Sequence, residues 1–220
     1  MVDKRKEAIR LMEEQKYEEV AKVFIQMIDE EPNDPIGYIN FANLLSQMRQ
    51  YGEAERFYLK AIQLDEKTAT AFYGLGNLYY EKSLFPEAEK SFKQAIHLGL
   101  LDSDVYFMLG MTYVKNEKLT LALPFLQRAT ELDEDVQKLF QYGLVLAQLH
   151  YLKEAEKVLL RVIDIQQHHP DALYNLGIIA VHHKQYREAI DYFDHALSSK
   201  PDHLLAKKAK ASVEKGIASE

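Results

Sequence analysis

The sequence predicts an all-α protein built from six stacked helix pairs followed by a capping helix. Two observations predict this fold. Short phrases around a small residue recur at intervals of 34 residues, as in "FYGLGNLYY" at 72–80 and "LYNLGIIAV" at 173–181. Within each interval the apolar residues follow helical spacing, with one stripe at positions 4, 7, 8 and 11 and a second at positions 20, 24 and 27. Each interval is therefore interpreted as one helix-turn-helix unit.

Six units follow from aligning these phrases. A small residue at position 8 would let two helices approach closely, and position 24 carries a bulky residue in the same fixed register. Position 8 holds Ala8, Ala42, Gly76, Gly110, Gly143 and Gly177, and position 24 holds Phe24, Tyr58, Phe92, Leu126, Leu159 and Phe193. The units span 1–34, 35–68, 69–102, 103–135, 136–169 and 170–203, the fourth being one residue short.

Gly74 and Gly76 stand two residues apart, as at the start of a phosphate-binding turn. Such a turn needs a strand before it, a helix after it and a third glycine or a Gly-Lys-Ser/Thr ending, whereas Tyr79 stands three residues beyond Gly76. Gly76 is instead the packing glycine of position 8. Gly74 gives up roughly 1 kcal/mol of helix propensity relative to alanine. It leaves a gap beside Tyr73 and Asn77, either a notch for a partner's side chain or tolerated sequence drift.

A last helix is predicted after the sixth unit, in residues 204–220. Its apolar residues recur at i, i+4 spacing, and this narrow stripe is expected to seal the open end of the last repeat. Its lysines are interpreted as a solvated face. The stripe consists of Leu205, Ala209, Val213 and Ile217, and the lysines are Lys207, Lys208, Lys210 and Lys215.

Composition excludes several function classes. The 220 residues carry 27 Lys and Arg against 34 Asp and Glu, a net charge of -7, so no basic field attracts nucleic acid or an anionic membrane. The absence of cysteine excludes disulfides, thiolate nucleophiles and Cys-ligated zinc, and fits a reducing compartment. The chain shows no signal-peptide pattern and no apolar run of about 20 residues. We expect a soluble, cytoplasmic protein.

Histidine and carboxylate patterns do not indicate a catalytic or metal site. Seven of the eight histidines lie in the last two repeats, but the adjacent His182 and His183 diverge by about 100° around a helix and cannot easily share a metal. These histidines are interpreted as solvated turn residues. Glutamates gather at turns and second-helix starts, where their charge complements the helix dipole. We expect no enzymatic activity, no metal and no cofactor.

The period, the small and bulky positions and the helix-turn-helix spacing closely resemble the tetratricopeptide repeat. The resemblance covers residues 1–203. It implies a single domain that forms a right-handed α-α superhelix, with the first helix of each pair on the concave side, and a capping helix at 204–220. It further implies a non-catalytic adaptor or scaffold that binds a peptide segment or partner element in the concave groove.

Positions that face the groove in this family carry amide and aromatic side chains in this sequence. An Asn or Gln side chain has both donors and an acceptor, so it can pair with the backbone of an extended peptide whatever the peptide's sequence. Aromatic and methionine side chains would add contact area, although they are equally suited to covering neighbouring helices. The predicted peptide-binding residues are Asn40, Asn43, Tyr73, Asn77, Tyr80, Phe107, Met111, Phe140, Gln141, Leu144 and Asn175.

Two functions from different classes follow. The first is a peptide-binding adaptor; the second is a structural component of a stable complex, or a stack that self-associates weakly through its ends or convex face. The family variant that grips a C-terminal carboxylate is not expected, because Thr70 and Gly74 stand where it needs cations. The expected partners are other proteins or peptide segments, without nucleic acid, membrane or small-molecule substrate.

Overall fold

The computed structural model of the chain describes residues 4–218. Within these residues thirteen α-helices follow one another, joined by short turns, and no strand is present. The predicted all-α fold of helix pairs is confirmed. The helices are α1 (Lys4–Glu13), α2 (Tyr17–Glu30), α3 (Pro35–Gln47), α4 (Tyr51–Leu64), α5 (Ala69–Glu81), α6 (Phe85–His97), α7 (Ser103–Lys115), α8 (Leu119–Leu132), α9 (Val136–Gln148), α10 (Leu152–Ile165), α11 (Pro170–His182), α12 (Tyr186–Ser199) and α13 (Leu204–Ala218).

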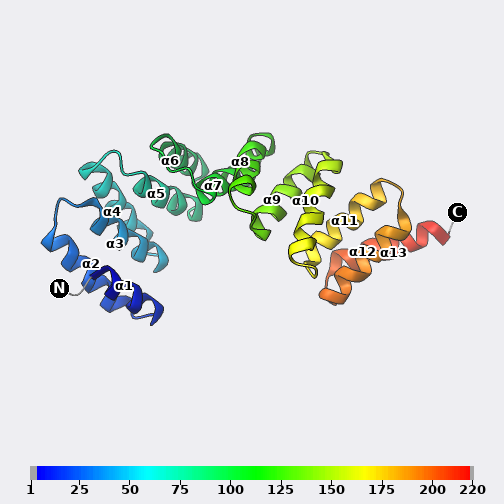
Figure 1. The fold of residues 1–220 in the computed structure, drawn as a ribbon, viewed down its shortest axis with the longest axis horizontal. Coiled ribbons are helices and arrows are strands. Elements are labelled where there is room, and N and C mark those ends of the chain that lie inside the picture. Colours follow the sequence, from blue (N-terminus) through cyan, green and yellow to red (C-terminus); the bar gives the residue numbers. More distant parts are fainter. Residues whose placement is uncertain (1–3, 219–220) are drawn as a thin grey trace. The chain divides into compact units, whose positions relative to one another are not determined.

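These helices form two compact units. The amino-terminal unit, residues 1–116, contains α1 to α7, and the carboxy-terminal unit, residues 117–220, contains α8 to α13 (Figure 1). Inside the units, the pairs α1–α2, α3–α4, α5–α6, α9–α10 and α11–α12 each fall within one predicted repeat. The helices of the fourth predicted repeat, α7 and α8, belong to different units. The single domain predicted for 1–203 therefore stays a prediction.

Glycine at position 8 lets the two helices of a pair touch. A Cβ atom added to Gly76 would lie 2.6 Å from Cε1 of Phe92, and one added to Gly177 would lie 2.4 Å from Cε1 of Phe193. Both phenylalanine rings are completely buried. The close approach predicted for position 8 is present in these two pairs, and the position-24 ring is the neighbour that it brings close.

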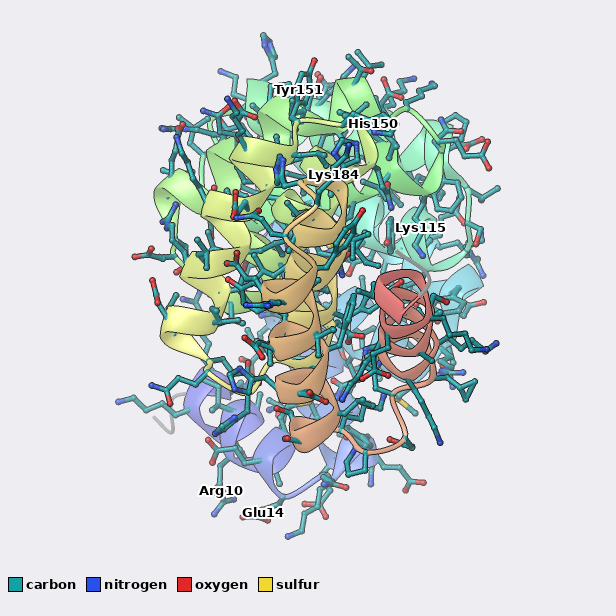
Figure 2. All side chains as sticks on the ribbon, turned by 90° about the vertical axis from the view of Figure 1, so that its right-hand side faces the viewer. Arg10, Glu14, Lys115, His150, Tyr151 and Lys184 are labelled. Atoms are coloured by element: carbon teal, nitrogen blue, oxygen red, sulfur yellow. The ribbon has the colours of Figure 1, made fainter. Side chains whose placement is uncertain are left out.

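The turn inside each repeat uses one left-handed residue at position 15. Its φ lies between 56° and 63° in all six repeats, although none of these residues is glycine. In the first repeat the N–H of Lys16 donates to the carbonyl of Leu11 at 2.9 Å, which is the long bond of a Schellman motif. Figure 2 shows two of the position-15 side chains, His150 and Lys184, at the surface. The six residues are Gln15, Arg49, Ser83, Glu117, His150 and Lys184.

The last residue of most repeats caps the helix that follows. Asp34, Asp102 and Asp135 each accept a backbone N–H from the first turn of α3, α7 and α9. A side-chain oxygen at this place satisfies an amide that has no partner within the helix. In the last two repeats a histidine takes the same place.

His169 and His203 are these capping histidines, and interpreting them as solvated turn residues was wrong. Nδ1 of His169 accepts the N–H of Ala172 at 3.2 Å, and Nδ1 of His203 accepts that of Ala206 at 3.1 Å. His203 is only 5% exposed, and its Nε2 donates to Oδ1 of Asp171 at 3.1 Å. The interpretation failed because an unprotonated imidazole nitrogen accepts a hydrogen bond as a carboxylate does.

The capping helix α13 buries part of the predicted stripe. Leu205 is 58% exposed, whereas its neighbour Ala206 is completely buried. Ala209 and Val213 pack against the core of the last repeat, as predicted. The buried face therefore runs i, i+3, i+7 from Ala206, because the helix cap fixes how the first turn faces the repeat. The side chain of Ile217 lies outside the described residues.

The lysine face of α13 is only partly solvated. Lys207 and Lys208 are exposed. Nζ of Lys210, however, lies 2.5 Å from a carboxylate oxygen of Asp194 and 3.6 Å from one of Glu214. Lys210 thus links the capping helix to α12, and the predicted solvated face was wrong for this residue.

Replacing Gly177 with alanine should destabilise the fold by about 1–3 kcal/mol, because the new Cβ meets the Phe193 ring and the overpacking outweighs the gain in helix propensity. Gly143→Ala should cost less, since its Cβ would meet the flexible Leu159 side chain at 3.0 Å. In the control Gly52→Ala, no atom lies within 4 Å of the new Cβ, and a stabilisation of about 0.5–1 kcal/mol is expected. Thermal melts followed by circular dichroism measure these changes. Equal Tm values for Gly177→Ala and Gly52→Ala would contradict the packing.

Acidification should weaken the cap of α11. Burial lowers the pKa of His169 below its usual value, and the nearby Asp171 carboxylate partly opposes this shift. The unfolded chain therefore takes up a proton on His169 at a higher pH than the folded chain does. The stability that the cap contributes is fully present above about pH 6.5 and is lost as the pH falls towards the lowered pKa of the folded protein. His169→Asn keeps a side-chain acceptor that does not titrate, so its Tm should fall less than that of the wild type between about pH 7 and pH 5.5. An equal fall in both proteins would rule out this role of His169.

Candidate functional site

The first helices of the second and third repeats, α3 and α5, lie side by side and line one pocket. On each helix the lining residues recur three or four positions apart, so they share one helix face. Two tyrosines of α4 complete the wall. The pocket, here called the α3–α5 pocket, has a volume of about 380 Å³ and is lined by Ile39, Asn43, Ser46, Tyr51, Tyr58, Thr70, Tyr73, Gly74, Asn77, Leu78 and Glu81.

A short hydrogen bond organises one side of this pocket. The hydroxyl of Tyr58 donates to Oδ1 of Asn43 at 2.5 Å. Tyr58 is only 2% exposed, and burial raises the pKa of its hydroxyl, which keeps it a neutral donor. Because this bond uses the amide oxygen of Asn43, the amide hydrogens of that side chain remain available to a ligand.

Two other polar atoms of the pocket lack hydrogen-bond partners within the described chain. They are Oδ1 of Asn77 and Oγ of Ser46, and both atoms are buried from solvent. A buried polar atom without a partner costs about 1–3 kcal/mol. Oδ1 of Asn77 is therefore an unused acceptor, whereas the Ser46 hydroxyl can donate as well as accept and interacts with the Tyr58 hydroxyl.

The space directly over Gly74 is filled by a tyrosine ring. A Cβ added to Gly74 would lie 2.4 Å from Cε1 and 2.8 Å from the hydroxyl oxygen of Tyr58. The ring of Tyr58 from the preceding repeat occupies the space directly over Gly74. Gly74 nevertheless lines the α3–α5 pocket between Tyr73 and Asn77, so a notch for a partner's side chain stays a prediction. Only the second repeat has tyrosine at position 24, and only the third has glycine at position 6. That coincidence was the signal in the sequence that could have revealed this contact.

Three of the predicted peptide-binding residues meet in the α3–α5 pocket: Asn43, Tyr73 and Asn77. Tyr73 also packs on Phe92 of its own repeat, with ring centroids 5.9 Å apart. Its side chain therefore both covers a neighbouring helix and lines the pocket. Sequence reasoning missed Ser46, because a small hydroxyl side chain in an apolar helix gives no signal of its own.

The other predicted residues of the amino-terminal unit lie outside this pocket. Asn40 lines a second pocket of about 390 Å³ against α1, together with Arg5 and Glu13. Tyr80 packs edge-on against Phe85, with centroids 5.9 Å apart, as the helix-covering alternative predicts. Phe107 and Met111 are half-buried on α7.

The remaining four predicted residues belong to the carboxy-terminal unit. Phe140 packs on the capping His169, with ring centroids 4.6 Å apart. The side-chain amide of Asn175 donates to the carbonyl of Asp171 at 2.7 Å, so this donor serves its own helix. Gln141 and Leu144 are half-buried on α9. Their assignment to peptide binding stays a prediction.

A third pocket, of about 550 Å³, lies in the carboxy-terminal unit against the second helices α10 and α12. His168, His195 and Asp164 are among its lining residues. Nevertheless, nowhere in residues 4–218 do three or more His, Asp or Glu side chains form a group suited to a metal ion. Of the described helices, none combines the length and the apolar character that crossing a membrane requires.

Gly74→Ala should destabilise the protein by about 1–3 kcal/mol, because the methyl group displaces the Tyr58 ring and breaks its bond to Asn43. Tyr58→Leu places at position 24 the residue found in the fourth and fifth repeats, and it removes the obstacle. In the Tyr58→Leu background, Gly74→Ala should lower the free energy of unfolding by at least about 1 kcal/mol less than it does in the wild type. Urea unfolding of the wild type, the two single variants and the double variant measures this coupling. Additive losses would show that the two residues do not interact.

Comparison with known proteins gives repeat matches along much of the chain. Models described as "TPR repeat" and "Tetratricopeptide repeat" match residues 42–83, 73–136 and 170–203. A search of curated proteins finds no match. Two solved structures are similar in fold at low identity. The MamA protein has 22% identity, a TM-score of 0.71 and coverage of 77% of this chain and 93% of its own. The Pseudomonas aeruginosa protein pilF has 15% identity, a TM-score of 0.80 and coverage of 94% and 95%.

A more similar solved structure is that of YrrB, described as "a TPR protein with an unusual peptide-binding site". It is 42% identical to this chain, with a TM-score of 0.81 and coverage of 87% of this chain and 99% of its own. This identity extends over nearly the whole of YrrB, and the repeat models match independently. The chain therefore belongs to the tetratricopeptide repeat family.

Proposed function

We propose that this protein is a non-catalytic adaptor that binds an extended peptide segment of another protein at the α3–α5 pocket. One observation carries the proposal: Oδ1 of Asn77 is buried in a pocket and has no donor within the described chain. A backbone N–H of a bound peptide is the commonest donor that would satisfy it.

The two asparagines of the pocket complement a peptide backbone. Asn43 has its oxygen bound by Tyr58 and presents amide hydrogens, which suit a peptide carbonyl. Asn77 presents an oxygen, which suits a peptide N–H. Tyr51 and Tyr73 add aromatic area beside them. This combination binds main chain with little dependence on peptide sequence.

The family relationship supports the same class of function. YrrB, at 42% identity, is described as having a peptide-binding site. We assign the wider peptide-contacting surface of the amino-terminal unit to Asn40, Tyr80, Phe107 and Met111, and that of the carboxy-terminal unit to Phe140, Gln141, Leu144 and Asn175. These residues would extend contact beyond the pocket.

Self-association is the second candidate function, and one observation favours it. Leu204 and Leu205, in the first turn of α13, are 62% and 58% exposed. Adjacent exposed leucines at the end of a repeat stack suit contact with another chain. This candidate would be favoured if the mass of the wild type in light scattering rises with concentration. The variant with both leucines replaced by glutamine should then keep the mass of a monomer.

The adaptor proposal is tested by panning a library of random linear peptides on the full chain and measuring the selected peptides by fluorescence anisotropy. Asn77→Ala should weaken binding by roughly tenfold, because it removes one buried hydrogen bond to the peptide. Asn33→Ala, an exposed turn substitution, is the matched control and should leave affinity unchanged. Failure to select any peptide, or equal affinity for the wild type and Asn77→Ala, would refute the proposal.

A further inference from the structure

We propose that the α3–α5 pocket receives a basic side chain, lysine or arginine, of the bound segment. This inference rests on the proposed function, because the basic residue belongs to a peptide. It specifies which side chain that peptide presents to the pocket.

One buried acceptor of the pocket lacks a donor. Oδ1 of Asn77 is buried without a partner, and the hydroxyl of Tyr58 has already donated its hydrogen to Asn43. An ammonium group carries three donors and a guanidinium five, and neither has an acceptor. A carboxylate would bring only further acceptors. The unused acceptor of Asn77 therefore favours a basic group over an acidic one.

The charge of the lining has the matching sign. Glu81 lies four residues after Asn77, on the same face of α5, and its carboxylate is the charged group of the pocket. Among the described residues that line the pocket none is lysine or arginine. The neighbouring cation on the chain, Lys82, is paired with Glu55, with 2.9 Å between Nζ and Oε2. Glu81 thus remains available to an external cation.

The shape and aromatic content of the pocket suit a single side chain. Its volume of about 380 Å³ falls within the range of small-ligand sites. The rings of Tyr51, Tyr58 and Tyr73 line it, and aromatic faces attract cations while covering the apolar stem of a lysine or arginine.

The pocket against α1 provides an internal contrast. It is of similar volume, about 390 Å³, but is lined by Arg5 as well as Glu13. Its lining therefore carries charges of both signs. None of the buried unpaired polar atoms in the described chain belongs to this lining. Of these two pockets, the α3–α5 pocket is the one that combines a carboxylate, an unused acceptor and several aromatic rings.

The experiment uses peptides selected on the full chain from a random linear library. Lysine or arginine should be enriched at one position. A synthetic peptide with that residue should bind the wild type roughly tenfold more tightly than the same peptide with norleucine, which keeps the stem and removes the charge. Glu81→Gln should weaken binding of the basic peptide by about three- to fivefold, as for a partly exposed ion pair, and should leave the norleucine peptide unaffected.

Glu66→Gln is the matched control, because Glu66 is exposed in the turn before α5 and does not line the pocket; it should change neither affinity. Selected peptides without a preferred basic position would overturn this inference and leave the adaptor function standing. An equal effect of Glu81→Gln on both peptides would overturn it in the same way. If no peptide is selected at all, the proposed function and this inference fail together.

Discussion

Contact between a small residue at position 8 and a large one at position 24 is the constraint on which the rest of the structure depends. The Phe193 ring lies so close to Gly177 that a single methyl group would clash with it. This approach brings the two helices of a pair together and leaves the outer side of the first helix free for other residues. Some side chains that line the candidate site, such as Tyr58 and Leu78, belong to this core, and they hold the polar lining residues in place.

The second repeat modifies this contact, and the α3–α5 pocket results from the modification. Tyr58 carries a hydroxyl that the phenylalanines at position 24 lack, and the hydroxyl reaches Asn43 on the neighbouring first helix. The ring then crosses the backbone of the next repeat at Gly74, where no side chain fits. Two rings thus explain the glycine pair of "FYGLGNLYY". Gly74 makes room for Tyr58 of the preceding repeat, and Gly76 makes room for Phe92 of its own repeat.

Periodicity predicted the helices well, because the residues that a repeat buries are set by the spacing of apolar residues, which can be counted in the sequence. It predicted the site less well. Asn43, Tyr73 and Asn77 were placed on one face from their positions, but Tyr58 was assigned to the core alone, since no spacing rule says which way a buried ring turns. The histidine caps were missed for a related reason. His169 and His203 align with Asp135, but a histidine nitrogen accepts a hydrogen bond only in one tautomer, and the folded structure selects that tautomer. Leu205 was placed inside because a step of four residues back from Ala209 reaches it, whereas the buried face takes a step of three, to Ala206.

The unpaired oxygen of Asn77 affects both the stability of the free protein and its affinity for a ligand. In the free protein that buried atom costs about 1–3 kcal/mol, which is a sizeable part of the stability of a domain. An aspartate there would cost more, since a buried charge without a partner is heavily penalised, and a leucine would remove the cost together with the acceptor. Asparagine keeps the acceptor neutral, so the pocket can be empty without unfolding the repeat. A donor from a ligand then recovers free energy that the folded chain alone does not obtain, and the nearby Glu81 carboxylate determines which donors recover most.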